Sequence, residues 1–162
     1  MELAAASGRD VVFVATARPS DPDMAARIRA HRDERPAGWR TLEEPERVAE
    51  RVAEQPAAAC VVVDCLALWV SNLMAAGRGP AGVVGEAEAL AAALAARESA
   101  VVVTNEVGMG VHPATELGRA YRDLLGRVNA VVAGAADAAY LVVAGRLLPL
   151  LPAAEALGRG AP

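Results

Sequence analysis

The sequence contains no lysine, and all 16 of its positive charges are arginine. This absence excludes a Walker A loop, G-x-x-x-x-G-K-[ST], in which the lysine contacts the phosphates of a nucleotide. The glycines at 77–82 and 108–110 have neither that spacing nor a following lysine, and they are typical of ordinary loops. The phosphate-binding loop of such a nucleotide site is therefore missing from this sequence.

Long apolar runs, an excess of positive charge and paired cysteine motifs are also absent. No apolar stretch approaches the roughly 20 residues that span a bilayer. The N-terminus lacks the features of a secretory signal, so we expect a cytoplasmic protein. The net charge of -4 argues against general nucleic-acid binding. Cys60 and Cys65 have no second pair and no neighbouring histidine, and we interpret them as reduced structural thiols rather than as a zinc site.

What is present is the composition of a folded domain. The chain has 162 residues, of which 54% are hydrophobic, 22% charged and only 3% aromatic. This length suffices for one domain with a hydrophobic core and is too short for two. We therefore expect a single domain over residues 1–150, followed by a tail over residues 151–162.

Apolar runs alternate with helical patterns along the chain. The predicted buried strands are 11–16, 59–64, 100–105 and 138–143. Their apolar residues are continuous, as in parallel strands that are covered on both faces. The helical patterns cover about 20–31, 45–54, 66–76, 83–97 and 115–133. This alternation predicts an α/β domain with a mainly parallel sheet flanked by helices.

Polar residues follow the predicted strands at their carboxyl ends. Thr16 ends the first strand, Asp64 the second, and Asn105 with Glu106 the third. Ligands of parallel α/β sheets bind at this edge. Asp64 has two interpretations: a Walker B-type carboxylate that holds Mg²⁺, or a cap for the helix that follows it.

His31 is one of only two histidines and ends an arginine-rich helical segment. Met24 and Ile28 share its helical face, so it could simply face the protein body or stabilise the helix C-terminus through the helix dipole. The second interpretation is a nucleophile. A neutral imidazole can attack a nucleoside triphosphate and hold the nucleotide as a phosphoramidate between two half-reactions. Spacing alone favours the first interpretation.

Two further side chains lie in predicted loops. His112, which precedes Pro113, is interpreted as a polar loop residue. Trp39 follows Pro-Ala-Gly in a chain that is poor in aromatic residues. It either stacks on a nucleotide base or anchors its own loop.

Five segments together resemble a known enzyme family: VFVATA, DPDMAARIRAHRDERPAGWRTLEEP, VVVDCLALWVSNLM, VVVTNEVGMGVHP and GRAYRDLLGRVNAVVAGAADAAYLVVAG. They occur in family order and cover most of residues 11–145. The family is the bifunctional adenosylcobinamide kinase / adenosylcobinamide-phosphate guanylyltransferase of cobalamin biosynthesis. Its most specific patterns here are H-[RK]-x-x-RP-x-x-W-x-T, which begins at His31, and NEVGMG. The resemblance implies a P-loop, RecA-like α/β fold, so residues 1–150 would form a nucleotide-binding domain.

The resemblance also implies two linked reactions. The hydroxyl of adenosylcobinamide is phosphorylated, and GMP is then transferred from GTP to that phosphate. In the family a histidine carries the GMP, and His31 is the matching position. The matching nucleotide contacts are Ala15, Thr16, Ala17, Pro36, Ala37, Gly38, Trp39 and Asp64. Mg²⁺ with Asp64 as a ligand, GTP and ATP as substrates, and a homotrimer are implied as well, without a nucleic-acid partner or a membrane span.

The sequence departs from the family pattern mainly at its start. The family opens with a strand and a loop like GGxRSGKS, and here both are expected to be missing. His112 stands where an aliphatic residue is usual, Ala130 follows Asn129 where Gln is common, and the usual terminal lysine is absent. Loss of one preorganised donor can lower a rate by about 10²–10³, so we expect both reactions to be impaired.

Three interpretations of function follow. The first is an enzyme of this family, given as a fragment or with a misassigned start. The second is a catalytically impaired remnant that acts as a binding or assembly partner. The third, another P-loop nucleotide kinase, explains neither the His31 segment nor NEVGMG.

Overall fold

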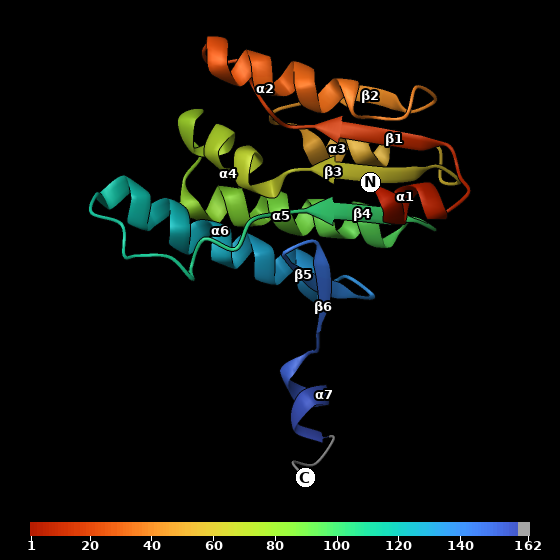
Figure 1. Cartoon of the computed structure of the whole chain (residues 1–162). Helices are drawn as coiled ribbons and strands as arrows, with labels where there is room; N and C mark the ends of the chain where they lie inside the picture. Colours follow the sequence, from red (N-terminus) through yellow and green to blue (C-terminus); the bar gives the residue numbers. More distant parts are fainter. Residues whose placement is uncertain (159–162) are drawn as a thin grey trace.

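A four-stranded parallel sheet forms the centre of the computed structural model, which describes residues 1–158 (Figure 1). The strands lie in the order β2-β1-β3-β4, with bounds β1 Val11–Ala15, β2 Arg40–Glu43, β3 Cys60–Asp64 and β4 Ala100–Val103. β1 and β3 occupy the middle of the sheet, where their Val-rich sequences are covered on both faces. The predicted parallel α/β sheet is confirmed.

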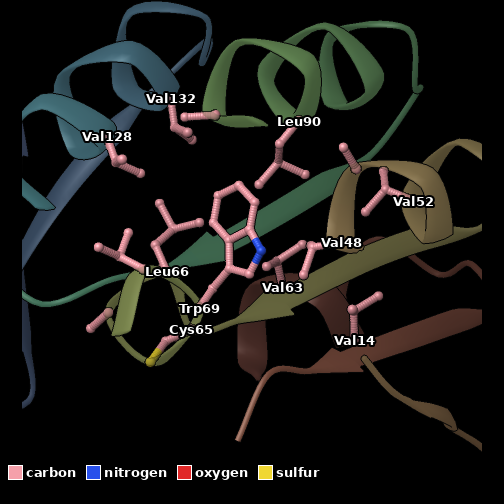
Figure 2. Close-up of a cluster of buried hydrophobic side chains, with 14 of the residues drawn as sticks. Val14, Val48, Val52, Val63, Cys65, Leu66, Trp69, Leu90, Val128 and Val132 are labelled. Carbon is pink, nitrogen blue, oxygen red and sulfur yellow. The ribbon is translucent and has the colours of Figure 1, made fainter. Parts of the chain in front are cut away.

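One face of the sheet packs against four helices: α3 (Val48–Ala53), α4 (Leu66–Ala75), α5 (Pro80–Ala95) and α6 (Glu116–Gly134). Each lies within three residues of its predicted bounds. Trp69 of α4 is fully buried at the centre of this core, between valines of the strands and apolar side chains of the helices (Figure 2). Its indole Nε1 donates a hydrogen bond of 2.7 Å to the Glu46 carbonyl. This well-packed face holds β3 and α4, and with them the strand end at Asp64.

The opposite face carries a much smaller core. The short helix α1 (Glu2–Ala6) and α2 (Pro22–Asp33) lie over it. Its buried residues are Ala4, Val11, Phe13, Ala15, Cys60 and Val62, with Trp39 and Val101 packed against them. No residue of α2 is buried. The face that carries α2 and His31 is therefore only partly covered.

Local capping sets the start of α2. Asp21 is the N-cap and accepts a hydrogen bond of 2.8 Å from the Met24 amide, while Pro22 occupies the first turn. That hydrogen bond, with one from Ser20, lowers the pKa of the fully exposed Asp21 carboxyl. The predicted start at Ser20 is thus early, because the side chain that accepts from the Met24 amide is that of Asp21. The helix continues past His31 to Asp33.

The prediction of a fourth parallel strand at 138–143 is wrong. This segment forms β5 (Ala139–Val143), which pairs antiparallel with β6 (Arg146–Leu150) in a separate two-stranded sheet. Both residues of the turn, Ala144 and Gly145, have positive φ values of 49° and 71°. Such a turn matches the twist of a tight hairpin, and it returns the chain at once to pair with β5.

The last described residues form the short helix α7 (Ala153–Gly158), where we expected an irregular tail. Residues 159–162 of that predicted tail lie outside the described part. The boundary between a domain over 1–150 and a tail stays a prediction. Within residues 1–158, no helix has the length and apolar character needed to cross a membrane.

Candidate active site

The carboxyl ends of β1 and β3 are joined through Thr16. In the parallel register, Ala15 lies opposite Asp64. The Thr16 amide donates to the Asp64 carbonyl at 3.0 Å. The Thr16 hydroxyl donates to the Cys65 carbonyl at 2.8 Å and accepts from the Cys65 amide at 2.9 Å. Asn72 Nδ2 then donates to the Thr16 carbonyl at 2.7 Å, so the strand end is fixed from both sides.

Thr16 is fully buried, and the structure gives its side chain a role in positioning Asp64. Ala15 is also buried, whereas Ala17 is partly exposed. The three residues lie beside Asp64, as expected from their place at the strand end. Their contact with a nucleotide stays a prediction.

His31 and Asp64 are in direct contact although they are far apart in the sequence. His31 Nε2 lies 2.7 Å from Asp64 Oδ2, and His31 Nδ1 lies 3.4 Å from Glu34 Oε2. The His31 side chain is 44% exposed and that of Asp64 is 20% exposed. His31 is therefore not a core histidine. It lies at the surface of the sheet, in contact with the strand-end carboxylate.

The buried ring of Phe13 supports three neighbours of the site. The His31 ring meets it edge-on at a centroid distance of 6.0 Å, and the Trp39 ring lies at 6.3 Å with a tilt of 30°. The guanidinium carbon of Arg35 lies 3.8 Å from the ring centroid, a cation–π geometry. Phe13 thus orients His31 and Arg35 on one surface.

Arg35 places a positive charge close to this pair. Burial lowers the pKa of Arg35, and the charge of Asp64 acts in the opposite direction. Arg35 Nη1 donates to Thr41 Oγ1 at 3.2 Å, while its Nε–H is buried without a hydrogen-bond partner among the described residues. An arginine stays charged in such a setting, so it can offset the negative charge of a phosphate.

A cavity of about 220 Å³ opens at the His31–Asp64 pair. Its lining residues are Met1, Ala4, Phe13, His31, Val62, Asp64, Val101 and Val103. The floor is apolar sheet surface, and the two polar side chains lie together on its wall. An imidazole beside a carboxylate at the carboxyl edge of a parallel sheet can act as a nucleophile or as a base.

None of residues 36–39 is among those that line this cavity. Pro36, Ala37 and Gly38 are exposed, and the Trp39 amide donates to the Pro36 carbonyl at 3.0 Å to close a turn. Gly38 lines a different cavity of about 510 Å³ at the amino ends of the strands, together with Asp10 and Arg40. The structure therefore does not bring Gly38 next to Asp64. Trp39 packs on Phe13, and its contact with a nucleotide base stays a prediction.

The NEVGMG segment forms a loop at the carboxyl end of β4, and hydrogen bonds with Asn129 of α6 tie the start of this loop to that helix. Thr104 Oγ1 donates to Asn129 Oδ1 at 2.7 Å, and Asn129 Nδ2 donates to the Asn105 carbonyl at 3.1 Å. Glu106 Oε1 accepts from the Gly108 amide at 2.9 Å. The exposed His112 pairs with Arg122 through a 2.8 Å contact, which confirms it as a polar loop residue.

The remaining sequence expectations concern cysteines and metals. Cys60 and Cys65 are both free and buried, as expected for structural thiols, and burial raises the pKa of the Cys65 thiol. In the described part of the chain, no three or more His, Cys, Asp or Glu residues are grouped so that they could hold a metal ion. Asp64 is therefore not part of such a group among the described residues.

Three residues of the site did not follow from the sequence reasoning: Phe13, Glu34 and Arg35. Glu34, the C-cap residue of α2, follows His31 by three residues, a spacing that places side chains on one helical face, whereas Arg35 lies beyond the helix. This spacing could have identified Glu34. Phe13 carried no signal, because a buried aromatic residue within a strand is indistinguishable from any other core residue.

Comparison with known proteins agrees with these features. The family model for cobinamide kinase / cobinamide phosphate guanyltransferase matches residues 1–150. The chain is 42% identical over 150 residues to the bifunctional adenosylcobalamin biosynthesis protein CobP of Pseudomonas aeruginosa, covering 91% of this chain and 86% of the relative. It is 38% identical over 149 residues to the bifunctional adenosylcobalamin biosynthesis protein CobU of Salmonella typhimurium, covering 83% and 82%. The chain therefore belongs to the cobinamide kinase / cobinamide phosphate guanyltransferase family of enzymes.

Proposed function

We propose that this chain acts in adenosylcobalamin biosynthesis as a cobinamide kinase and cobinamide phosphate guanylyltransferase, with His31 as the residue that carries GMP. The observation that carries this proposal is the 2.7 Å contact between His31 Nε2 and Asp64 at the wall of a cavity. Membership of the family supports the two activities. The histidine, the strand-end carboxylate and the nearby Arg35 support a site for phosphorus chemistry.

The transfer of GMP would take place in two displacements. In the first, a nitrogen lone pair of His31 forms a bond to the α-phosphorus of GTP, the bond from that phosphorus to the bridging oxygen breaks, and pyrophosphate leaves. In the second, a phosphate oxygen of adenosylcobinamide phosphate attacks the same phosphorus. The N–P bond then breaks, and its electron pair returns to the imidazole.

The proposed nucleotide contacts are Ala15, Thr16, Ala17, Pro36, Ala37, Gly38, Trp39 and Asp64. Asp64 is also the proposed Mg²⁺ ligand. Mg²⁺ binds through one or two carboxylates, several waters and the substrate phosphates, so the Asp64 carboxylate suits this ion. Bound there, Mg²⁺ would neutralise charge on the phosphates of GTP or ATP. The residues of the chain itself orient the imidazole and exclude water from the apolar floor.

Incubation with GTP labelled at the α-phosphate, in the presence of Mg²⁺, tests the proposal. We expect an acid-labile protein adduct that is lost in His31→Asn and retained in His112→Asn, a control at the other histidine. Absence of an adduct from the native chain would overturn His31 as the GMP carrier. A chain that folds stably but binds no nucleotide would instead support the remnant that acts as an assembly partner.

Two further parts of the proposal concern the whole molecule. We propose a homotrimer in the cytoplasm. Exposed apolar side chains on β5 and β6, such as Val142, Val143, Leu147 and Leu148, support self-association because they lack a covering layer within the described residues. Light scattering coupled to gel filtration measures the assembly directly, and a monomeric mass at micromolar concentration would contradict it.

A further inference from the structure

The three most exposed large apolar side chains that the structure describes lie close together in the sequence. Val111 is 96% exposed, Met109 77% and Leu117 70%. Met109 and Val111 belong to the loop that joins β4 to α6, and Leu117 lies in the first turn of α6. Single exposed apolar residues are common on protein surfaces, whereas several at one place mark a binding surface. We call these three residues the 109–117 group.

The loop that carries this group is held at both ends. Before the group, Val107 packs against the main core. After it, Arg119 Nη1 donates to the Pro113 carbonyl at 3.1 Å, and Thr115 caps α6 by accepting a 3.1 Å hydrogen bond from the Gly118 amide. Because the main chain is already ordered on both sides, a ligand that covers the group has little loop entropy to overcome.

The 109–117 group follows the same edge of the sheet as the candidate active site. β4 pairs with β3, and its last residue, Val103, lies opposite Asp64. The loop begins directly after Val103, which also lines the 220 Å³ cavity at His31. Figure 1 shows the loop between β4 and α6 at the end toward which the strand arrows point. The cavity and the loop therefore adjoin through the end of β4.

The cavity at His31 is too small for the whole of a cobinamide. Its volume is about 220 Å³, whereas pockets for drug-sized ligands measure roughly 300–1,000 Å³, and a corrin ring with its amide side chains is larger than such ligands. In cobinamide the reacting hydroxyl ends a short side arm of the ring. The arm can therefore enter the cavity while the ring stays outside. The methyl-bearing faces of the ring are apolar, so covering them with apolar side chains is favourable.

Two other parts of the molecule have the size or the apolar character to receive the ring, but both are placed less well. The cavity of about 510 Å³ lies at the amino ends of the strands. The five residues of β3, roughly 17 Å of extended chain, separate that end of the sheet from Asp64. The apolar hairpin of β5 and β6 follows the far end of α6, a helix of 19 residues that spans roughly 28 Å.

We propose that the corrin ring of the substrate docks on the 109–117 group, with its side arm directed into the cavity at His31. The proposal rests on the proposed function, which supplies the class of substrate. Met109 has an unbranched side chain that adapts to an irregular apolar face, and Val111 and Leu117 add branched apolar contacts. The group binds and orients the ring and takes no part in bond making.

Equilibrium dialysis with cobyric acid tests the docking without requiring catalysis. Cobyric acid keeps the corrin ring but lacks the aminopropanol arm, and its own absorbance reports the bound fraction. The double variant Met109→Ser/Val111→Ser should raise the Kd about tenfold, because two apolar side chains no longer cover the ring. Both positions are exposed, so the fold should be retained, and an unchanged urea midpoint checks this.

The matched control is Leu147→Ser/Leu148→Ser on β6, which removes two other exposed apolar side chains and should leave the Kd unchanged. A native chain that binds no cobyric acid would overturn the proposal. An equal rise of the Kd in the two double variants would overturn it too, because the ring would then adsorb to any apolar surface. A rise in the β6 variant alone would place the ring on the hairpin instead.

Two further measurements separate this inference from its alternatives. If Met109→Ser/Val111→Ser lowers the mass measured by light scattering and leaves the Kd unchanged, the group is an interface between copies of the chain and the proposal is overturned. The GMP adduct of the native chain forms without a corrinoid. An adduct without binding of cobyric acid would therefore reject the docking alone, whereas binding without an adduct would reject His31 as the carrier and leave the docking intact.

Discussion

Thr16 and Cys65 are joined by two hydrogen bonds between one hydroxyl and one peptide unit. The Thr16 Oγ1 donates to the Cys65 carbonyl at 2.8 Å and accepts from the Cys65 amide at 2.9 Å. Cys65 directly follows Asp64, so this pairing fixes the main chain that carries the carboxylate. The contact links the end of β1 to the start of α4.

Thr16→Val should therefore destabilise the protein and disturb the site. The substitution keeps the shape of the side chain but leaves the buried Cys65 amide without its partner, at a cost of about 1–3 kcal/mol. Urea unfolding followed by circular dichroism measures the change. Thr16→Ser retains the hydroxyl and should lose less stability than Thr16→Val. An equal loss in the two variants would show that the methyl group, rather than the hydrogen bonds, is responsible.

Trp69→Phe should be among the more destabilising single substitutions in the core. Trp69 is fully buried, and its Nε1 donates to the Glu46 carbonyl at 2.7 Å. Phenylalanine leaves a void and removes this donor, for a combined loss of about 2–4 kcal/mol in unfolding free energy. Trp39→Phe is the matched control, because Trp39 is only partly buried and should lose less. Comparable losses at the two positions would contradict the assignment of Trp69 to the main core.

Glu44 should make the stability of the fold depend on pH in the acid range. Burial raises the pKa of this carboxyl, but hydrogen bonds from the amides of Glu46 and Arg47 and from Arg51 outweigh it, and the pKa lies below its ordinary value of 4.5. A lowered pKa stabilises the folded state above pH 4.5, and this contribution is lost as the pH falls through the folded-state pKa.

Urea unfolding at a series of pH values from neutral to about 3 measures this dependence. Glu44→Gln should reduce the slope below pH 4.5 because the titrating group is removed. Glu98→Gln, at an exposed surface pair with Arg9, should change the slope much less. An unchanged slope in Glu44→Gln would show that other carboxyl groups dominate.

The central sheet followed from the sequence because its strands are continuous apolar runs. The edge strand β2 did not, since Arg40, Thr41, Leu42 and Glu43 contain one strongly apolar residue and are stabilised by pairing with β1. Likewise, Leu147 and Leu148 gave no sign that residues 146–150 would pair with 139–143. Both strands depend on contacts with a partner rather than on their own pattern.

The sequence identified several residues of the candidate site, but it predicted only some of the contacts between them. Asp64 and Thr16 were expected together, because parallel strands end at the same edge of a sheet. The contact between His31 and Asp64 could not be derived from helical spacing, since it depends on how α2 lies over Phe13. The position of Gly38 beside Asp10, rather than beside Asp64, depends on the turn that leads into β2.

Arg35→Met should weaken nucleotide binding while leaving the fold largely intact. Methionine keeps an unbranched stem over the Phe13 ring but removes the guanidinium that lies 3.8 Å from its centroid. Because this charge lies close enough to Asp64 for the carboxylate to affect the pKa of Arg35, it is also placed to attract phosphate. We expect the Kd for GTP to rise about tenfold, the scale of one charge-assisted hydrogen bond. Isothermal titration calorimetry in the presence of Mg²⁺ measures it.

The matched control for Arg35 is Arg27→Met on α2, the helix that ends shortly before Arg35. Arg27 is exposed, and the structure records no ion pair for it among the described residues, so its loss changes the net charge by the same amount without altering the site. If binding of GTP depends on the local position of Arg35, only Arg35→Met should raise the Kd about tenfold. An equal effect of the two variants would instead mean that α2 attracts phosphate through its overall charge. In that case the effect would also disappear at high salt, because exposed charges are screened over about 10 Å at 0.1 M ionic strength.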